Sequence, residues 1–202
     1  GMSFKDYTIE TFKGGADDGI VSQGGSPTGY FLRKYIQEAT SFEPGKEAVS
    51  KHHWVIYRYA ETLLTYAESM VNAFNDVNYT DETYKYSALW AINEVRKNAD
   101  MPLIPSMGKD EFMERLYNEW RVEFAFEDHR FWDIRRWLIA DDEGVMKGAM
   151  YGLQLSAVTG APGKVHYKPY VFENRLWSDR SYLHPIKQTE IDKGYMLQNP
   201  GW

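Results

Sequence analysis

The feature that most constrains the fold is a run with helical periodicity between about residues 54 and 74. Its apolar side chains recur every three or four positions, so they cover a wide part of one helical face. A face this broad needs other helices packed on it, and the small residues Ala60 and Ala67 would let one approach closely. A mainly α fold is therefore expected. The two neighbouring stripes are Tyr59, Leu63, Tyr66 and Met70, and Ala60, Leu64, Ala67 and Val71.

More helices follow from the same kind of pattern. Asn75 and Asp76 should end the first helix, and Thr80 or Asp81 can cap the next one. Two helices joined by so short a polar link form a helical hairpin of the tetratricopeptide type. After Pro102 and Pro105 the periodicity resumes. The helices expected after the first span about 82–99, 110–126 and 130–138, with a short helix signal at 189–191.

The chain of 202 residues fits a single domain with three parts. Residues 1–50 are an irregular leader segment broken by glycine and proline, and residues 51–140 form the helical core. Residues 141–202 form a loop-rich closing segment. Within that segment, residues 145–181 are expected to be one long irregular stretch. Loops of this length are unusual unless they are functional or held by the rest of the fold.

Composition excludes several classes of protein. The net charge is −6, with 23 Lys and Arg against 29 Asp and Glu, so nucleic acid is not an expected partner. Cysteine is absent, which excludes disulfides, thiol nucleophiles and thiolate metal sites. No apolar run reaches roughly 18 residues, the length of a membrane span. No cofactor and no metal are expected.

The densest charged cluster lies between residues 119 and 137. Glu123 and Glu127 are one helical turn apart, so a glycoside hydrolase using this pair is one alternative. His129 and Asp133 have the same spacing and could hold a metal on a helix. The favoured interpretation is structural, because arginines alternate with the acids and aromatic residues stand between them. The arginines are Arg121, Arg130, Arg135 and Arg136, and the acids are Glu119, Glu123, Glu127 and Asp133. No catalytic residue is expected.

Aromatic residues of the closing segment are the candidate ligand contacts. They fit no helical stripe, and flat rings can stack on the apolar faces of sugars. Trp177 is the first candidate, because Ser178, Asp179 and Arg180 follow it and could bind hydroxyl groups. Tyr151 and Tyr170 come next. The interpretation favoured over ligand contact is that these rings, with Tyr167 and Phe172, hold the long segment against the helices.

Five segments together resemble the SusD/RagB family of outer-membrane nutrient-binding lipoproteins. Residues 58–68 (RYAETLLTYAE) resemble the family's R-Y-A-E-x-L-L-x-Y-A-E helix, and 93–96 (NEVR) its N-x-V-R helix. Residues 121–137 (RVEFAFEDHRFWDIRRW) resemble R-x-E-L-A-F-E-G-H-R-x-x-D-L-R-R-W. Residues 182–186 (YLHPI) and 198–202 (QNPGW) are similar to Y-L-x-P-I-P and the closing Q-N-P-G-Y. The departures are Asp128 for Gly, Lys187 for the second Pro and Trp202 for Tyr.

The resemblance implies a SusD-like α-α superhelix with tetratricopeptide-like hairpins, exposed at the bacterial cell surface. Such a protein binds a glycan or oligosaccharide without catalysis and delivers it to a SusC-like TonB-dependent porin. The full-length family member is anchored in the outer membrane by a lipid, and its upstream half and anchor are expected to be missing from this chain. A helical protein–protein interaction scaffold with no small-molecule ligand is the main alternative.

Overall fold

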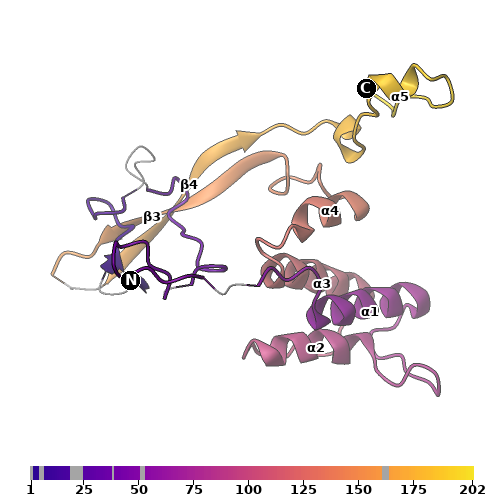
Figure 1. Ribbon diagram of the computed structural model, residues 1–202. Coiled ribbons are helices and arrows are strands. Elements are labelled where there is room, and N and C mark those ends of the chain that lie inside the picture. The colour runs from indigo at the N-terminus through magenta and orange to yellow at the C-terminus, as the bar shows by residue number, and fades with distance from the viewer. Residues whose placement is uncertain (1, 5–6, 19–24, 38, 51–52, 161–163) are drawn as a thin grey trace. The chain divides into compact units, whose positions relative to one another are not determined.

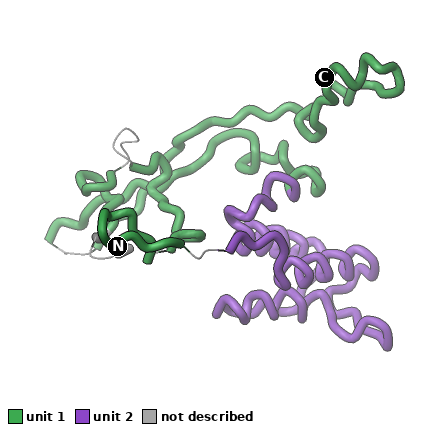
Figure 2. Tube along the Cα trace, in the orientation of Figure 1, with its two compact units in different colours: residues 1–52, 134–202 green, residues 53–133 purple. Residues whose placement is uncertain are grey.

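The computed structural model describes residues 2–4, 7–18, 25–37, 39–50, 53–160 and 164–202. Contacts divide the chain into two compact units, coloured separately in Figure 2. One unit comprises residues 53–133 and is helical. The other comprises residues 1–52 and 134–202 and contains the strands (Figure 1). The expected single domain with three parts stays a prediction.

The first helix, α1 (Tyr59–Phe74), begins five residues later than the periodicity predicts. Arg58 precedes it in an extended conformation, and Asn75 ends it with a left-handed backbone at φ 56°, as expected for an asparagine that closes a helix. Residues 54–57 are largely exposed. The helix buries Leu63, Leu64, Ala67, Met70 and Val71, so its second stripe faces the interior, while Tyr59 stays 69% exposed.

Helix α2 (Ala88–Asn98) packs on α1, which confirms a paired arrangement of the first two helices. Its N-cap is Ser87, whose hydroxyl accepts a hydrogen bond from the backbone N–H of Trp90 at 3.1 Å. The predicted start near residue 82 is therefore wrong. Asp81 caps a local turn, accepting from the N–H groups of Thr83 and Tyr84 at 2.8 and 2.6 Å, and this turn keeps residues 81–86 out of the helix.

Helices α3 (Lys109–Glu123) and α4 (His129–Arg136) lie close to their predicted bounds. The break between them contains Phe126 and Asp128, both with φ of 64°. Backbone in this region favours glycine, although Asp tolerates it better than most residues. The positive φ at position 128 explains why the resembled motif has glycine there, and Asp128 adopts this backbone with some conformational strain.

The apolar core described in the structure is almost entirely helical. Its largest fully buried side chains come from α1, α2, α3, the C-cap of α3 and α4: Phe112, Phe124, Leu64, Ile92, Leu116, Ile134 and Val71. Glu119 and Asp133 are also buried, and a buried carboxylate needs a partner. In the described part of the chain, every helix is too short or too polar to span a bilayer.

Residues 145–181 are not an irregular loop, and that prediction is wrong. Strands β3 (Gly148–Ala157) and β4 (Val165–Arg175) pair antiparallel over this segment, as Figure 1 shows. The register shifts between Met150 and Tyr151, so Phe172 is an extra residue in β4. Apolar and polar residues alternate from Tyr151 to Ala157, which is the period of a strand, but glycine and proline on either side obscure it.

The N-terminal segment covers the outer edge of β3. The N–H of Lys13 donates to the carbonyl of Leu155 at 2.7 Å, and the N–H of Leu153 donates to the carbonyl of Thr28 at 2.9 Å. A short hairpin of β1 (Met2–Phe4) and β2 (Tyr7–Ile9) precedes this segment. After β4 come a short helix η2 (Asp179–Tyr182) and α5 (Gln188–Ile191), the latter at the predicted helix signal.

Candidate functional site

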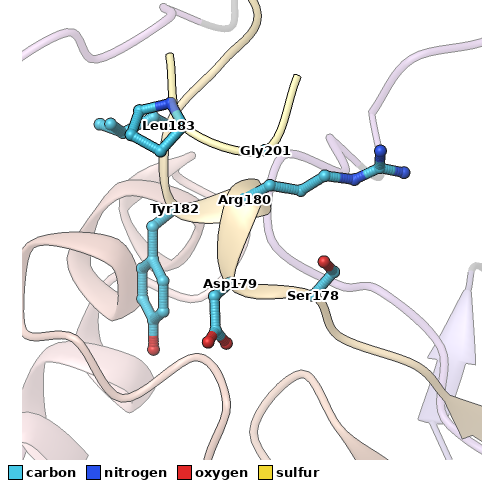
Figure 3. Close-up of a pocket in the computed structure, with 7 residues that line it drawn as sticks. Ser178, Asp179, Arg180, Tyr182, Leu183 and Gly201 are labelled. Atoms are coloured by element: carbon cyan, nitrogen blue, oxygen red, sulfur yellow. The ribbon is translucent and has the colours of Figure 1, made fainter.

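A cavity of about 570 Å³ opens at η2, directly after the tryptophan that sequence analysis placed first (Figure 3). We call it the C-terminal pocket. It contains the three polar residues predicted to bind hydroxyl groups, together with backbone from the last turn of the chain. Its lining is Ser178, Asp179, Arg180, Tyr182, Leu183, Pro200 and Gly201.

One wall of the C-terminal pocket depends on the last two residues. The indole N–H of Trp202 donates to the carbonyls of Arg180 and Leu183 at 2.9 and 3.0 Å. The Arg180 guanidinium lies 4.6 Å from the centre of the Trp202 ring, within cation–π range. Gly201 has a φ of 84°, and a Cβ there would lie 2.8 Å from the Cβ of Arg180, so glycine permits this close approach.

Tyr182 fixes a second wall. Its hydroxyl donates to the Asp141 carboxylate and accepts the Asp141 N–H at 3.2 Å. This hydrogen bond lowers the pKa of Asp141, with help from Lys147. Burial, and then the bond to Asp141, raise the pKa of Tyr182. Figure 3 shows Tyr182 and Arg180 leaving η2 in different directions.

The family's two C-terminal motifs bind each other. The Gln198 side chain forms a pair of hydrogen bonds with the backbone of Ile186, at 2.8 and 2.9 Å. The Asn199 amide donates to the carbonyl of His184 at 2.5 Å. These contacts position residues 200–202 beside η2, so the closing Q-N pair supports the C-terminal pocket.

Trp177 does not line that pocket. Its ring is half-buried and makes an edge contact with the Tyr182 ring, with 5.1 Å between the ring centres. The Arg135 guanidinium lies 5.2 Å from the centre of the Trp177 ring. Arg135 also donates to the carbonyl of Ser181 at 3.2 Å, and its burial lowers its pKa. Among the described residues no group accepts the buried indole N–H of Trp177. These contacts give Trp177 a role in holding η2, beside any role in binding.

The structure does not bring the other two predicted rings together. Tyr151 pairs with Val171, and Tyr170 pairs with Gly152 one position further on, so the two tyrosines lie on opposite faces of the hairpin. Tyr151 is 65% exposed. Both, like Tyr167 and Phe172, lie in strands and not in loops.

Tyr170 lines a second, smaller cavity of about 240 Å³, which we call the hairpin pocket. Its hydroxyl donates to the carbonyl of Pro27, which fixes the ring. Sequence analysis missed its other polar residues, because they come from segments far apart in the chain. The lining is Thr11, Asp18, Ser26, Gly29, Leu153, Gln154 and Tyr170.

Glu123 and Glu127 share a partner that sequence analysis did not include. Arg58 donates from all three guanidinium nitrogens, to both carboxylates and to the carbonyl of Glu123, and the bonds to Glu127 measure 2.8 and 3.0 Å. The guanidinium also lies 4.0 Å from the centre of the Phe124 ring. Burial lowers the pKa of Arg58, but the two carboxylates outweigh it and raise the pKa. The cluster is structural, and its central cation is Arg58.

Helix α1 makes a second contact of this kind. Glu61 lies 3.6 Å from the Nε2 atom of His129, and the His129 ring packs 4.3 Å from Phe124, centre to centre. Of the pair proposed to hold a metal, His129 therefore faces Glu61. Within the described residues, no group of three or more His, Asp or Glu side chains is arranged to hold a metal ion.

The N-x-V-R motif also has a structural reason. The Asn93 amide exchanges two hydrogen bonds with the backbone of Ile104, at 2.9 and 3.0 Å. Arg96 donates to the buried carboxylate of Glu119 at 2.5 Å and to the carbonyl of Pro102 at 2.8 Å. Both residues hold the 99–108 connection between α2 and α3, as a motif of fold determinants should.

Comparison with known proteins identifies a family and a solved structure that the chain resembles. The sequence profile of the SusD family matches residues 5–202. A crystal structure of a SusD-like protein from Bacteroides fragilis is 30% identical and superposes with a TM-score of 0.58. The match covers 74% of this chain and 26% of that one, so this chain spans about a quarter of its length. No curated protein matches the chain.

The chain belongs to the SusD family, and the motif residues Arg58, Glu61, Glu123, Glu127 and His129 account for its helical packing. The mainly α, SusD-like fold expected from the sequence is confirmed.

Proposed function

We propose that this protein binds a glycan or oligosaccharide at the bacterial cell surface and delivers it to a SusC-like TonB-dependent transporter. The observation that carries the proposal is the family match over residues 5–202, because the SusD family generally binds glycans for uptake at the outer membrane. In this role the full-length protein is lipid-anchored in that membrane.

The two pockets of the strand-containing unit support a sugar ligand. The C-terminal pocket offers a hydroxyl, a carboxylate and a guanidinium within a few residues. The hairpin pocket offers hydroxyls, an amide and a carboxylate beside the Tyr170 ring. Sugars present hydroxyl groups on their edges and C–H groups on their faces, so such sites combine a few placed polar groups with apolar surface. Trp177, Tyr151 and Tyr170 remain the proposed ring contacts.

The protein acts without catalysis in this proposal. The carboxylate pair required for a glycosidase is Glu123 and Glu127, and both are hydrogen-bonded to Arg58. Because these carboxylate oxygens accept charge-assisted hydrogen bonds from one guanidinium, neither carboxylate is free to act on a glycosidic bond. Purified protein should release no reducing sugar from any glycan that it binds. Hydrolysis that disappears in Glu123→Gln would support the glycosidase instead.

The test of binding is calorimetric titration of the chain with a panel of oligosaccharides, followed by Trp177→Ala with the best ligand. Weaker binding at an unchanged melting temperature would support direct contact. Because Trp177 packs on Arg135 and Tyr182, a lower melting temperature with unchanged affinity would make it an anchor. Trp132→Ala, at a tryptophan that is 59% exposed, is the matched control. Binding to a protein partner and to none of the sugars would favour the interaction scaffold.

A further inference from the structure

The helical unit contains a cavity of its own, separate from the two pockets above. It measures about 370 Å³ and lies between the start of α1, the end of α2 and the last residue of α3. We call it the α1–α2 pocket. Its lining is Arg58, Tyr59, Ala60, Leu63, Glu94, Val95, Asn98 and Glu123.

Helical spacing aligns the groups that face this cavity. Tyr59 and Leu63 are four residues apart on α1, and Glu94 and Asn98 are four apart on α2, so each pair lies on one side of its helix. Sites on packed helices hold their side chains more accurately than sites on loops. Here α1 packs on both α2 and α3, so the lining is fixed by the core beneath it.

The polar groups of the α1–α2 pocket are mainly acceptors. Among the described residues, Glu94 forms only a long ion pair with the exposed Lys97, at 3.8 Å, and such a pair contributes little. The side chains of Asn98 and Tyr59 form no hydrogen bond with any described residue. A ligand that donates hydrogen bonds would satisfy the Glu94 carboxylate, and the Asn98 amide can both donate and accept.

The one cation in the lining is already used. All three guanidinium nitrogens of Arg58 donate to Glu123 or Glu127, so an anionic ligand would meet two carboxylates without a free positive charge. The charge of the pocket therefore favours a neutral ligand with several hydroxyl groups.

The size and the apolar surface of the pocket further limit the ligands that fit it. The Tyr59 ring is 69% exposed, and Ala60, Leu63 and Val95 supply an apolar floor. The volume lies near the small end of the range of roughly 300–1,000 Å³ that is typical of ligand sites, which suits one sugar ring better than a chain of several. A flat apolar surface next to hydrogen-bond acceptors matches the two sides of a pyranose.

We propose that the α1–α2 pocket binds a single neutral sugar ring, with Tyr59 stacked on its C–H face and with Glu94 and Asn98 bound to its hydroxyls. The inference rests on the proposed function, since it assumes a glycan ligand, and it adds a sugar-binding site in the helical unit that is independent of Trp177, Tyr151 and Tyr170.

The test uses the 202-residue chain and the methyl glycosides of glucose, galactose, mannose and N-acetylglucosamine. Saturation-transfer NMR detects weak binding, and titration gives the dissociation constant. Tyr59→Ala and Asn98→Ala should each weaken the best glycoside about tenfold, the loss that follows from one stacked ring or one buried hydrogen-bonding group. Tyr59→Phe keeps the stacking ring and should bind more tightly than Tyr59→Ala. Glucuronic acid should bind more weakly than glucose.

Matched controls keep the result specific. Tyr57→Ala removes an exposed tyrosine outside the lining, and Asn118→Ala removes an exposed asparagine on α3; neither should change affinity. Equal binding by the parent, Tyr59→Ala and Asn98→Ala would overturn the inference, as would stronger binding of glucuronic acid. If oligosaccharides bind but no monosaccharide does, the inference fails and the proposed function stands. If no glycan binds at all, the proposed function fails with it.

Discussion

The helices of residues 53–133 and the β3–β4 hairpin are stabilised in different ways. The helices bury many apolar side chains, several of which have no exposed surface. Among the described residues they also bury two carboxylates, those of Glu119 and Asp133. In the hairpin, β4 is largely exposed and β3 is mostly half-buried, and Gly152 is the one buried residue of the two strands. Removing a side chain should therefore be costly in the helices and cheap in the hairpin, which leaves the hairpin's surface available for binding.

The two regions also differ in their ion pairs. In the helical unit, ion pairs join segments far apart in the sequence, such as Arg58 with Glu123 and Glu127. In the hairpin, Arg175 pairs with its near neighbour Glu173 at 2.8 Å, and both are well exposed. A long-range pair with little solvent access constrains the fold, whereas an exposed local pair contributes little.

The largest effect is expected from Arg58→Met, which would leave Glu123 and Glu127 without their shared cation. Their side chains are only 19% and 11% exposed. Removing one partner of a buried pair costs about 3–5 kcal/mol, because the other charge stays desolvated. Urea denaturation measures the change in free energy of unfolding. The control is Arg115→Met, whose pair with Glu111 is exposed and should contribute about 0–0.5 kcal/mol. Similar losses in both variants would contradict the distinction between the two kinds of pair.

A smaller loss is expected from Ala67→Leu. Ala67 has no exposed surface on α1, so the added atoms would overpack the interface and cost about 1–3 kcal/mol. Ala73→Leu, at an exposed position of the same helix, is the control and should be nearly neutral in thermal denaturation. Ala60 is only half-buried and lines the α1–α2 pocket, so Ala60→Leu should cost less than Ala67→Leu. The reverse order would mean that the buried stripe of α1 is misassigned.

The third effect depends on pH. The Tyr182 hydroxyl lowers the pKa of Asp141 below its ordinary value of 3.8, so its stabilisation is present above that value and is lost as pH falls through the folded-state pKa. Tyr182→Phe should raise the pKa of Asp141, which carboxyl NMR titration would show directly. The stability difference between parent and variant should also shrink as the pH falls below about 4. Tyr195→Phe, which loses a bond to Glu190, should leave Asp141 unchanged. An unaltered Asp141 titration in Tyr182→Phe would exclude this bond.

Sequence analysis was most successful where one local pattern decides the structure. The spacing of Leu64, Ala67 and Val71 gave the buried face of α1, and Asn75 gave its end. The start of α2 was wrong because Asp81 satisfies a turn instead of a helix. Local propensity could not choose between the two, since both use a side-chain oxygen to accept backbone N–H groups.

Predictions that required distant contacts were less successful. The acidic residues at 119, 123 and 127 were interpreted as structural, but the cations that bind them were not identified. Arg58 lies 69 residues from Glu127 in the sequence, and Arg96 lies 23 residues from Glu119. The hairpin was missed although Leu153, Gln154 and Leu155 alternate, because its strands are mostly exposed and lack a strong apolar signal. The pockets join segments that no local pattern connects.

The smallest effects on stability are expected on the apolar face of the hairpin. The strand register places Tyr151, Leu153 and Leu155 of β3 on the same face as Tyr167 of β4. Each of the two tyrosines is 65% exposed. Tyr151→Thr or Tyr167→Thr keeps a residue that favours strands and removes only cross-strand contacts, such as that of Tyr151 with Val171. Contacts of this kind contribute roughly 0.2–1 kcal/mol, so thermal denaturation should show a small shift. Because Tyr151 is also a proposed ligand contact, Tyr151→Thr should weaken glycan binding while the protein stays folded. A loss of stability as large as that of Ala67→Leu would mean that the face is packed and that the hairpin belongs, energetically, with the helices.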